Sequence, residues 1–296
     1  MSPIKHAERS LAFGLFLLAV TSVGWGLSFP IMKHLLTEWP PLSSRGLAGV
    51  AGGSTLALVA LARGERLSVP RAMWSRLLLV SALSISGWVA FMGLALLWLR
   101  ASEAALLGIT IPVWVAFLAW PILGERLSFL RAASLTIALA GIVVLLGGNG
   151  FEASVEKLPG IALALVAAIG VGLGIVLTKH FPLATPPLSL AAWQVGLGCL
   201  PVAIVGLAVE QPHLAALSWI GWASLVSMTL IQFCLCYVCW FAALERLPAA
   251  TASIGTLLVP VVAVLAAAAV LHEPLGLREI AALVITLGGV AMALRS

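Results

Sequence analysis

The chain repeats its own sequence at half its length. Residues 99–127 return 148 positions later, and residues 24–43 return 146 positions later. A drift of two residues over so long a span indicates that one module was duplicated. We therefore divide the chain into a first repeat, residues 1–149, and a second repeat, residues 150–296.

The duplicated module is too apolar for a water-soluble domain. Mean hydropathy is +1.14 and 9% of the residues are charged, whereas soluble domains carry about 25% charge. Apolar runs such as 161–171 and 259–271 do not alternate with polar residues, so helices are expected in the membrane and a β-barrel is not. Ten runs approach the roughly 20 residues that a spanning helix needs. They lie near 12–35, 42–62, 75–98, 103–123, 129–147, 159–179, 187–209, 217–243, 248–271 and 276–294.

Positive charge predicts how the chain crosses the membrane. With the amino terminus inside, eleven Lys and Arg residues fall on the cytoplasmic side, and the four outside are Lys33, Arg100, Lys157 and Arg278. The positive-inside rule then places both termini in the cytoplasm. Five helices per repeat is an odd number, so the two repeats must be inverted relative to each other. We expect an all-α polytopic membrane protein with ten transmembrane helices, arranged as two inverted five-helix repeats around a central cavity.

Several function classes fit this sequence poorly. The chain contains no Asp, and its eleven Glu and five His residues all fall near helix ends or in loops. A proton relay or an intramembrane enzyme would need such groups inside a span, so neither is expected. Cys234, Cys236 and Cys239 lack His or carboxylate companions, so we expect no metal site and no cofactor. The pI near 9.4 follows from the basic loops, so it indicates no nucleic-acid partner.

Arg45 lies about one turn into the second predicted span, away from the loops that hold most of the charge. A guanidinium is costly in lipid, so Arg45 should face the cavity or its mouth, or pair with a nearby glutamate. In the cavity it could bind a substrate carboxylate. The alternative is an arginine that extends to the membrane surface or holds a helix end. Lys33 and Lys179 lie at matched positions and fit interfacial anchors.

Aromatic and amide side chains within the spans are candidates for a binding wall. Aromatic belts belong at the membrane interfaces, so deeper rings could stack on a substrate, although each could equally serve packing. Amides within spans often bridge helices but can also bind substrate. The candidates are Trp25, Trp88, Trp114, Trp193, Tyr237, Trp240, Gln194 and Gln232.

Pro112 and Pro260 occupy matched positions in the fourth and ninth spans. A proline within a helix removes a backbone hydrogen bond and bends the helix, and transporters use broken helices at their binding sites. We expect both spans to bend around the cavity, with the hydroxyls of Thr110 and Thr256 nearby. The alternative is a bend that only improves packing.

The motifs of the two repeats resemble a known family. In the first copy they are residues 101–105, 112–113, 123–128 and 141–146. In the second copy they are residues 249–252, 260–261, 272–275 and 288–290. This pattern resembles the EamA-type repeat of the drug/metabolite transporter superfamily. The length and the Trp-rich interior are similar to those of bacterial aromatic amino-acid exporters.

The resemblance implies an exporter of small metabolites. We expect alternating access that carries neutral, especially aromatic, amino acids outward across a bacterial inner membrane. Because one chain supplies both halves of the pathway, a monomer is expected, with a small-molecule substrate and the lipid bilayer as its partners. Two alternatives remain: export of drugs or other metabolites by the same fold, and a membrane scaffold that transports nothing.

Overall fold

The structure of the 296-residue chain is a computed structural model. It describes residues 3–124, 133, 136–137, 140–141, 144, 150–181, 183, 185–213, 215, 217–247 and 256–295. Every regular element in this part of the chain is helical, which agrees with the all-α prediction.

Seven described segments are long and apolar enough to cross a membrane, and their ends fall within four residues of predicted spans. Four of them each lie within a single helix: α1 (Pro3–Leu35), α2 (Pro41–Ala62), α8 (Gly150–His180) and α9 (Pro187–Glu210). The other three consist of shorter pieces: η1 (Arg71–Met73), α3 (Trp74–Ser81), η2 (Ala82–Ser86) and α4 (Gly87–Ala95); α5 (Ala101–Gly108) and α6 (Ile111–Leu123); and α10 (Trp219–Ser227), η5 (Met228–Leu235) and α11 (Cys236–Leu244).

Three predicted spans are not among these seven segments. The ninth appears as α13 (Leu258–Leu271), because residues 248–255 lie outside the described part, and the tenth appears as α14 (Leu277–Arg295). The predicted fifth span, 129–147, lies mostly outside the described residues. Ten spans therefore stay a prediction, beside the seven that the described residues show.

The second helices of the two repeats form the most extensive helix pair, α2 with α9. Small residues let their backbones approach. A Cβ on Gly46 would clash with Ala203, and one on Gly53 would lie 2.7 Å from the backbone nitrogen of Gly196. The later residue on α2, Gly53, thus contacts the earlier residue on α9, Gly196. The two helices therefore run antiparallel, as an inverted repeat requires.

Another pair of contacts recurs at the spacing of the sequence repeat. Gly26 on α1 lies against Val262 on α13, where an added Cβ would meet the valine Cβ at 2.6 Å. Gly172 on α8 lies against Trp114 on α6, where the corresponding distance is 3.0 Å. Gly26 and Gly172 are sequence mates, meaning that they occupy matched positions in the two repeats, and so are Trp114 and Val262. Each repeat therefore packs its first helix on the fourth helix of the other.

The third and eighth predicted spans each contain a stretch of π-helix, η2 and η5. Moving η2 along the chain by 148 residues places it inside η5. Such stretches are rare and occur often at functional sites, because they leave backbone groups outside the regular ladder. Their recurrence indicates that both repeats keep the same irregularity.

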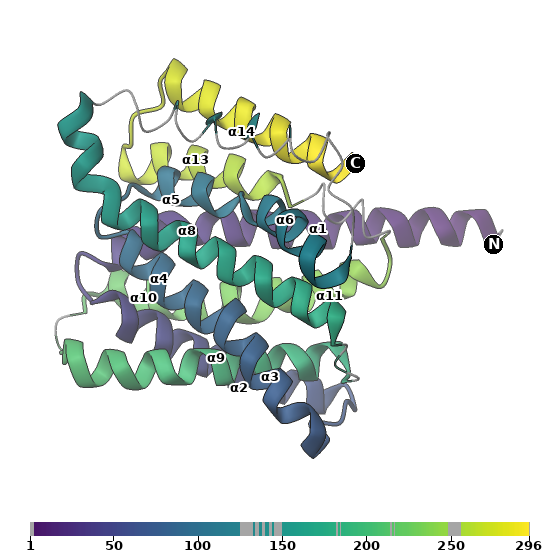
Figure 1. The fold of residues 1–296 in the computed structure, drawn as a ribbon. Helices are drawn as coiled ribbons and strands as arrows, with labels where there is room; N and C mark the ends of the chain where they lie inside the picture. Colours follow the sequence, from purple (N-terminus) through teal and green to yellow (C-terminus); the bar gives the residue numbers. More distant parts are fainter. Residues whose placement is uncertain are drawn as a thin grey trace.

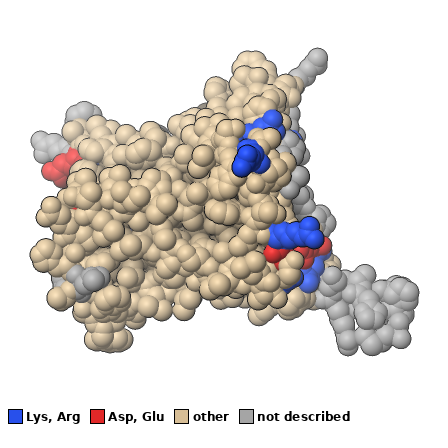
Figure 2. Space-filling model, turned by 90° about the horizontal axis from the view of Figure 1, so that it is seen from below, with Lys and Arg blue, Asp and Glu red and all other residues tan. Residues whose placement is uncertain are grey.

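Figure 1 shows the helices running between two ends of the bundle, with the first and last described residues toward the same end. On the face drawn in Figure 2, the middle of the molecule shows no charged residue. The Lys and Arg residues, in blue, gather on the right, which is the end where the termini lie in Figure 1. Large apolar side chains such as Phe16, Ile204 and Val284 are exposed. An apolar surface of this kind suits contact with lipid.

Candidate functional site

The fourth predicted span is broken where its proline predicts. Helix α5 ends at Gly108, residues 109–110 form a turn, and α6 begins at Ile111 with Pro112 as its second residue. A proline in the first turn of a helix loses no hydrogen bond, because the amide there has no partner within the helix. The span is therefore interrupted where the proline predicts, and a bend around a cavity stays a prediction. Pro260 is the third residue of α13, so it too lies in a first turn.

Thr110 and Trp114 hold this break together. The buried Thr110 hydroxyl donates to the carbonyl of Leu107 at 2.7 Å and accepts from the indole nitrogen of Trp114 at 3.2 Å. In this conformation the hydroxyl therefore serves the turn. Thr256 lies half-buried before α13, and its carbonyl accepts from the amide of Val259 at 3.0 Å.

Trp25, Tyr237 and Trp240 form an aromatic cluster between α1 and α11. The ring centroid of Trp25 is 5.8 Å from that of Tyr237, edge-on, and 5.8 Å from that of Trp240. The Trp25 indole nitrogen donates to the backbone carbonyl of Gln232 at 3.4 Å. Gln232 lies in η5 with 8% of its side chain exposed, and its amide oxygen accepts no hydrogen bond within the described chain. Four of the predicted residues, from α1, η5 and α11, thus lie close together.

Trp88 lies beside the broken span. An added Cβ on Gly108 would lie 3.0 Å from its ring, so α4 and the end of α5 touch through this indole. Trp88 packs against the main apolar core. The residue therefore borders the break at 109–110, and its place in a binding wall stays a prediction.

Trp193 and Gln194 are placed differently. The Trp193 indole nitrogen donates to the carbonyl of Leu67 at 2.8 Å, and its ring stands edge-on to Trp74 at 5.2 Å. These partners belong to the loop after α2 and the start of α3, and they are not those of Trp25. The structure does not join Trp193 to the aromatic cluster. Gln194 is half-buried beside it on α9.

Arg45 is a buried guanidinium without a partner in the described part of the chain. Only 2% of the residue is exposed, and none of its three side-chain nitrogens has a hydrogen-bond acceptor there. Its side chain crosses Gly93 on α4, where an added Cβ would lie 3.0 Å from the arginine Cδ. The described residues thus show none of the other arrangements that the sequence suggested, namely a glutamate partner, a side chain that extends to the surface, or one that holds a helix end.

Glutamates from one repeat cap helices of the other. The Glu210 carboxylate, at the end of α9, accepts from the amides of Leu42 and Ser43 at the start of α2, at 3.0 and 2.7 Å. Glu65, after α2, accepts in turn from the Ser189 amide at 2.8 Å, at the start of α9. The two helices therefore cap each other reciprocally. This explains why these carboxylates fall at helix ends, which the sequence showed without showing their partners.

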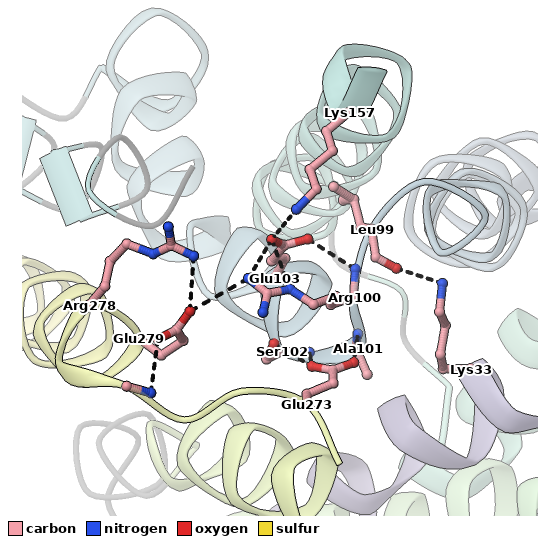
Figure 3. A network of polar contacts seen from close by, with 11 residues as sticks. Lys33, Leu99, Arg100, Ala101, Ser102, Glu103, Lys157, Glu273, Arg278 and Glu279 are labelled. Atoms are coloured by element: carbon pink, nitrogen blue, oxygen red, sulfur yellow. Dashed lines mark hydrogen bonds and ion pairs between the residues drawn. The ribbon is translucent and has the colours of Figure 1, made fainter. Parts of the chain in front are cut away.

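A larger polar network joins the repeats at the opposite end from the chain termini (Figure 3). Glu103, in the first turn of α5, is fully buried, and its carboxylate lies 2.6 Å from the Lys157 ammonium and 3.0 Å from the Arg100 guanidinium. Glu279 lies 3.6 Å from Arg100 and 3.1 Å from Arg278. Sequence reasoning missed this network, although it had grouped its three basic residues with Lys33 as the four on the outer side.

Glu273 and Lys33 extend the network. The Glu273 carboxylate accepts from the amide of Ala101 at 2.7 Å and from both the amide and the hydroxyl of Ser102. The half-buried Lys33 ammonium donates to the carbonyls of Leu96 and Leu99 at the end of the third span. It therefore holds a helix end, which is more specific than the interfacial anchor expected.

An apolar pocket of about 580 Å³ lies between α1, α13 and α14. Its lining includes Leu15, Leu18 and Val261 and none of the predicted site residues. This pocket is therefore not the predicted central cavity, and that cavity stays a prediction.

The four cysteines are free and buried. Cys199 packs on Gly49 and Cys236 on Gly24, where added Cβ atoms would clash with the sulfurs. No group of three or more possible metal ligands occurs among the described residues. The thiols of Cys199 and Cys236 thus fill small spaces between helices, as expected.

Comparison with known proteins identifies the family. The model of the EamA-like transporter family matches residues 12–147 and again residues 158–295. The chain belongs to this family. As an EamA-like protein it is a membrane transporter and not an enzyme, in agreement with the resemblance seen in its motifs.

Several relatives are named as transporters. The uncharacterized transporter YvbV of Bacillus subtilis (strain 168) is 26% identical over 93% of this chain and 90% of its own length. An uncharacterized transporter of Archaeoglobus fulgidus is 28% identical over 94% and 97%. A probable amino-acid metabolite efflux pump of Salmonella typhimurium is 29% identical over 93% and 92%. A crystal structure, described only as that of a protein, shares the fold with a TM-score of 0.69 at 22% identity, over 97% of this chain and 96% of the other.

Proposed function

We propose that this EamA-like transporter exports small metabolites that carry a carboxylate, most specifically neutral and aromatic amino acids. The observation that carries the proposal is Arg45, a buried guanidinium whose nitrogens have no acceptor in the described chain. Burying an unpaired charge is costly. A substrate carboxylate would supply two acceptors in the geometry of the guanidinium fork.

The aromatic cluster supports the preference for aromatic side chains. The rings of Tyr237 and Trp240 each lie 5.8 Å from that of Trp25, and the nearby amide oxygen of Gln232 has no donor in the described chain. Rings in this arrangement can accept another ring edge-on or offset, and an amide oxygen can accept from a substrate ammonium. The name of the Salmonella relative, an amino-acid metabolite efflux pump, points the same way.

The mechanism that we propose is alternating access by ten helices in two inverted repeats. The break between α5 and α6 lets the two halves of one span tilt separately, and the π-helical stretches η2 and η5 offer matched flexible points in both repeats. The protein acts as a monomer in the bacterial inner membrane, with both termini in the cytoplasm. The gathering of basic residues at the end with the termini supports this orientation.

Counterflow in proteoliposomes tests the proposal. Labelled phenylalanine is added outside vesicles preloaded with unlabelled amino acids or organic cations, for the original protein, Arg45→Lys and Arg45→Gln. We expect exchange with amino acids, reduced by Arg45→Lys and lost in Arg45→Gln. Arg76→Gln is the matched control, because Arg76 is exposed and lies 4.9 Å over the ring of Phe181.

Two results would overturn the proposal. Exchange with cations but not with amino acids would favour drug export, for which the wholly apolar lining of the pocket between α1, α13 and α14 is suitable. Amino-acid exchange that Arg45→Gln leaves intact would remove the carboxylate site while retaining an amino-acid carrier.

A further inference from the structure

The polar network at one end of the bundle connects the two repeats through buried charge. Glu103 and Arg100 belong to the first repeat, whereas Lys157 and Glu279 belong to the second (Figure 3). Glu103 is 0% exposed and Lys157 donates to it at 2.6 Å. A buried pair of this kind is costly to break, because separation leaves an uncompensated charge on each side.

The same end also fastens the start of α5 to the second repeat through uncharged donors. Glu273 accepts from two successive amides and a hydroxyl at residues 101–102. It follows α13 after His272, whose left-handed φ of 54° ends that helix as Gly124 (φ 71°) ends α6. The sequence mate of Glu273, Glu125, lies outside the described residues.

The charged network, in contrast, has no counterpart in the sequence of the other repeat. The repeat offsets assign a mate to each of Arg100, Glu103, Lys157, Arg278 and Glu279. These mates are Pro248, Thr251, Leu11, Leu130 and Arg131. The set contains no carboxylate and one cation, so it cannot form ion pairs among its members. Pro248 also lacks the amide that Arg100 donates to Glu103 at 3.0 Å.

We propose that this network is an outer gate that makes the empty carrier rest closed to the outside and open to the cytoplasm. In an inverted repeat, opening one end corresponds to closing the other. An ion-pair network whose members have no matching charged set in the other repeat therefore favours the state in which its own end is closed. The proposal rests on the orientation and export direction given under the proposed function, and it deepens them by naming what sets the resting state.

A resting state of this kind suits export. A carrier that waits open to the cytoplasm loads substrate where the cell makes it, and substrate binding must then supply the free energy that separates Glu103 from Lys157. The inner end has no sequence mates for these pairs, so it closes and reopens without breaking an equivalent of this network. The gate thus changes the relative populations of the inward-open and outward-open states without contacting the substrate.

The test measures access to a reporter without any substrate. The four native cysteines are replaced by alanine, and Thr110→Cys, seven residues beyond Glu103 along the same span, is labelled with a membrane-impermeant maleimide. We expect slow labelling from outside and faster labelling from the cytoplasmic side. Glu103→Gln and Lys157→Met should each raise outside labelling about ten-fold, which corresponds to a shift of roughly 1.4 kcal/mol in the equilibrium between states.

Lys157→Arg keeps the ion pair and should label like the parent. Glu38→Gln should also leave labelling unchanged, because Glu38 lies after α1 near the same end but bonds Ser218 instead of the network. If one variant does not fold, the other carries the test. Unchanged outside labelling in a folded Glu103→Gln or Lys157→Met protein, or a rise seen only from the cytoplasmic side, would overturn the gate. Because no substrate is present, loss of amino-acid counterflow would leave this result standing.

Discussion

At the scale of single residues, a change at Arg45 should have opposite effects on transport and on stability. Its guanidinium has no acceptor in the described chain, and an arginine inside the membrane costs about 3 kcal/mol on insertion scales. We expect Arg45→Met to raise the unfolding temperature in detergent while counterflow is lost. Arg76→Met, which removes an exposed guanidinium, should change neither by much. A lower unfolding temperature for Arg45→Met would mean that the guanidinium holds the fold.

Glu38 gives a residue-scale prediction about pH. Its carboxylate accepts from the Ser218 hydroxyl and amide, both at 2.7 Å, and these bonds hold the pKa of Glu38 below its usual range. A lowered folded-state pKa adds stability above the unfolded-state value and loses it as the pH falls through the folded-state value. Glu38→Gln should therefore unfold at a lower temperature than the parent near neutral pH. The difference should vanish in acid, and a constant difference would contradict this account.

At the scale of helices, sequence alone predicted most positions and few irregularities. Lipid allows the backbone only a helix or a closed barrel, and apolar runs without alternation favour the helix. These runs gave seven spans within four residues of their ends. Pro112 predicted its break for an equally local reason. The π-helical stretches η2 and η5 carry no such signal, because they depend on what packs beside them. The partners of Glu65, Glu103 and Glu273 were equally invisible, since each lies far away in the sequence.

Pro112 and Pro121 allow a matched test of the break, because both lie in α6. Pro112→Ala restores an amide at the second residue, so the span can become continuous through residues 109–110. We expect Pro112→Ala to slow transport about ten-fold, or roughly 1.4 kcal/mol in barrier, with an unchanged or higher unfolding temperature. Pro121→Ala should leave transport near the parent rate. Equal effects of the two changes would show that the break serves packing alone.

At the scale of the whole molecule, the reciprocal caps of α2 and α9 make the two repeats stabilise each other. Glu65 accepts from the Ser189 amide at 2.8 Å, and Glu210 accepts from the Ser43 amide at 2.7 Å. A carboxylate that caps a helix contributes about 1–2 kcal/mol. Each of Glu65→Gln and Glu210→Gln should lower the free energy of unfolding by about that much.

The double variant then tests whether the caps act independently. Helix α2 has 22 residues, which at 1.5 Å per residue separates the two caps by roughly 30 Å. Sites so far apart usually add within about 0.5 kcal/mol, so the double variant should lose the sum of the single losses. A clearly larger loss would show that the α2–α9 pair separates as one unit once both ends are free, and that the repeats then come apart along this interface. Ser54→Ala, whose hydroxyl donates within α2 to the carbonyl of Val50, is the control that should leave the free energy of unfolding nearly unchanged.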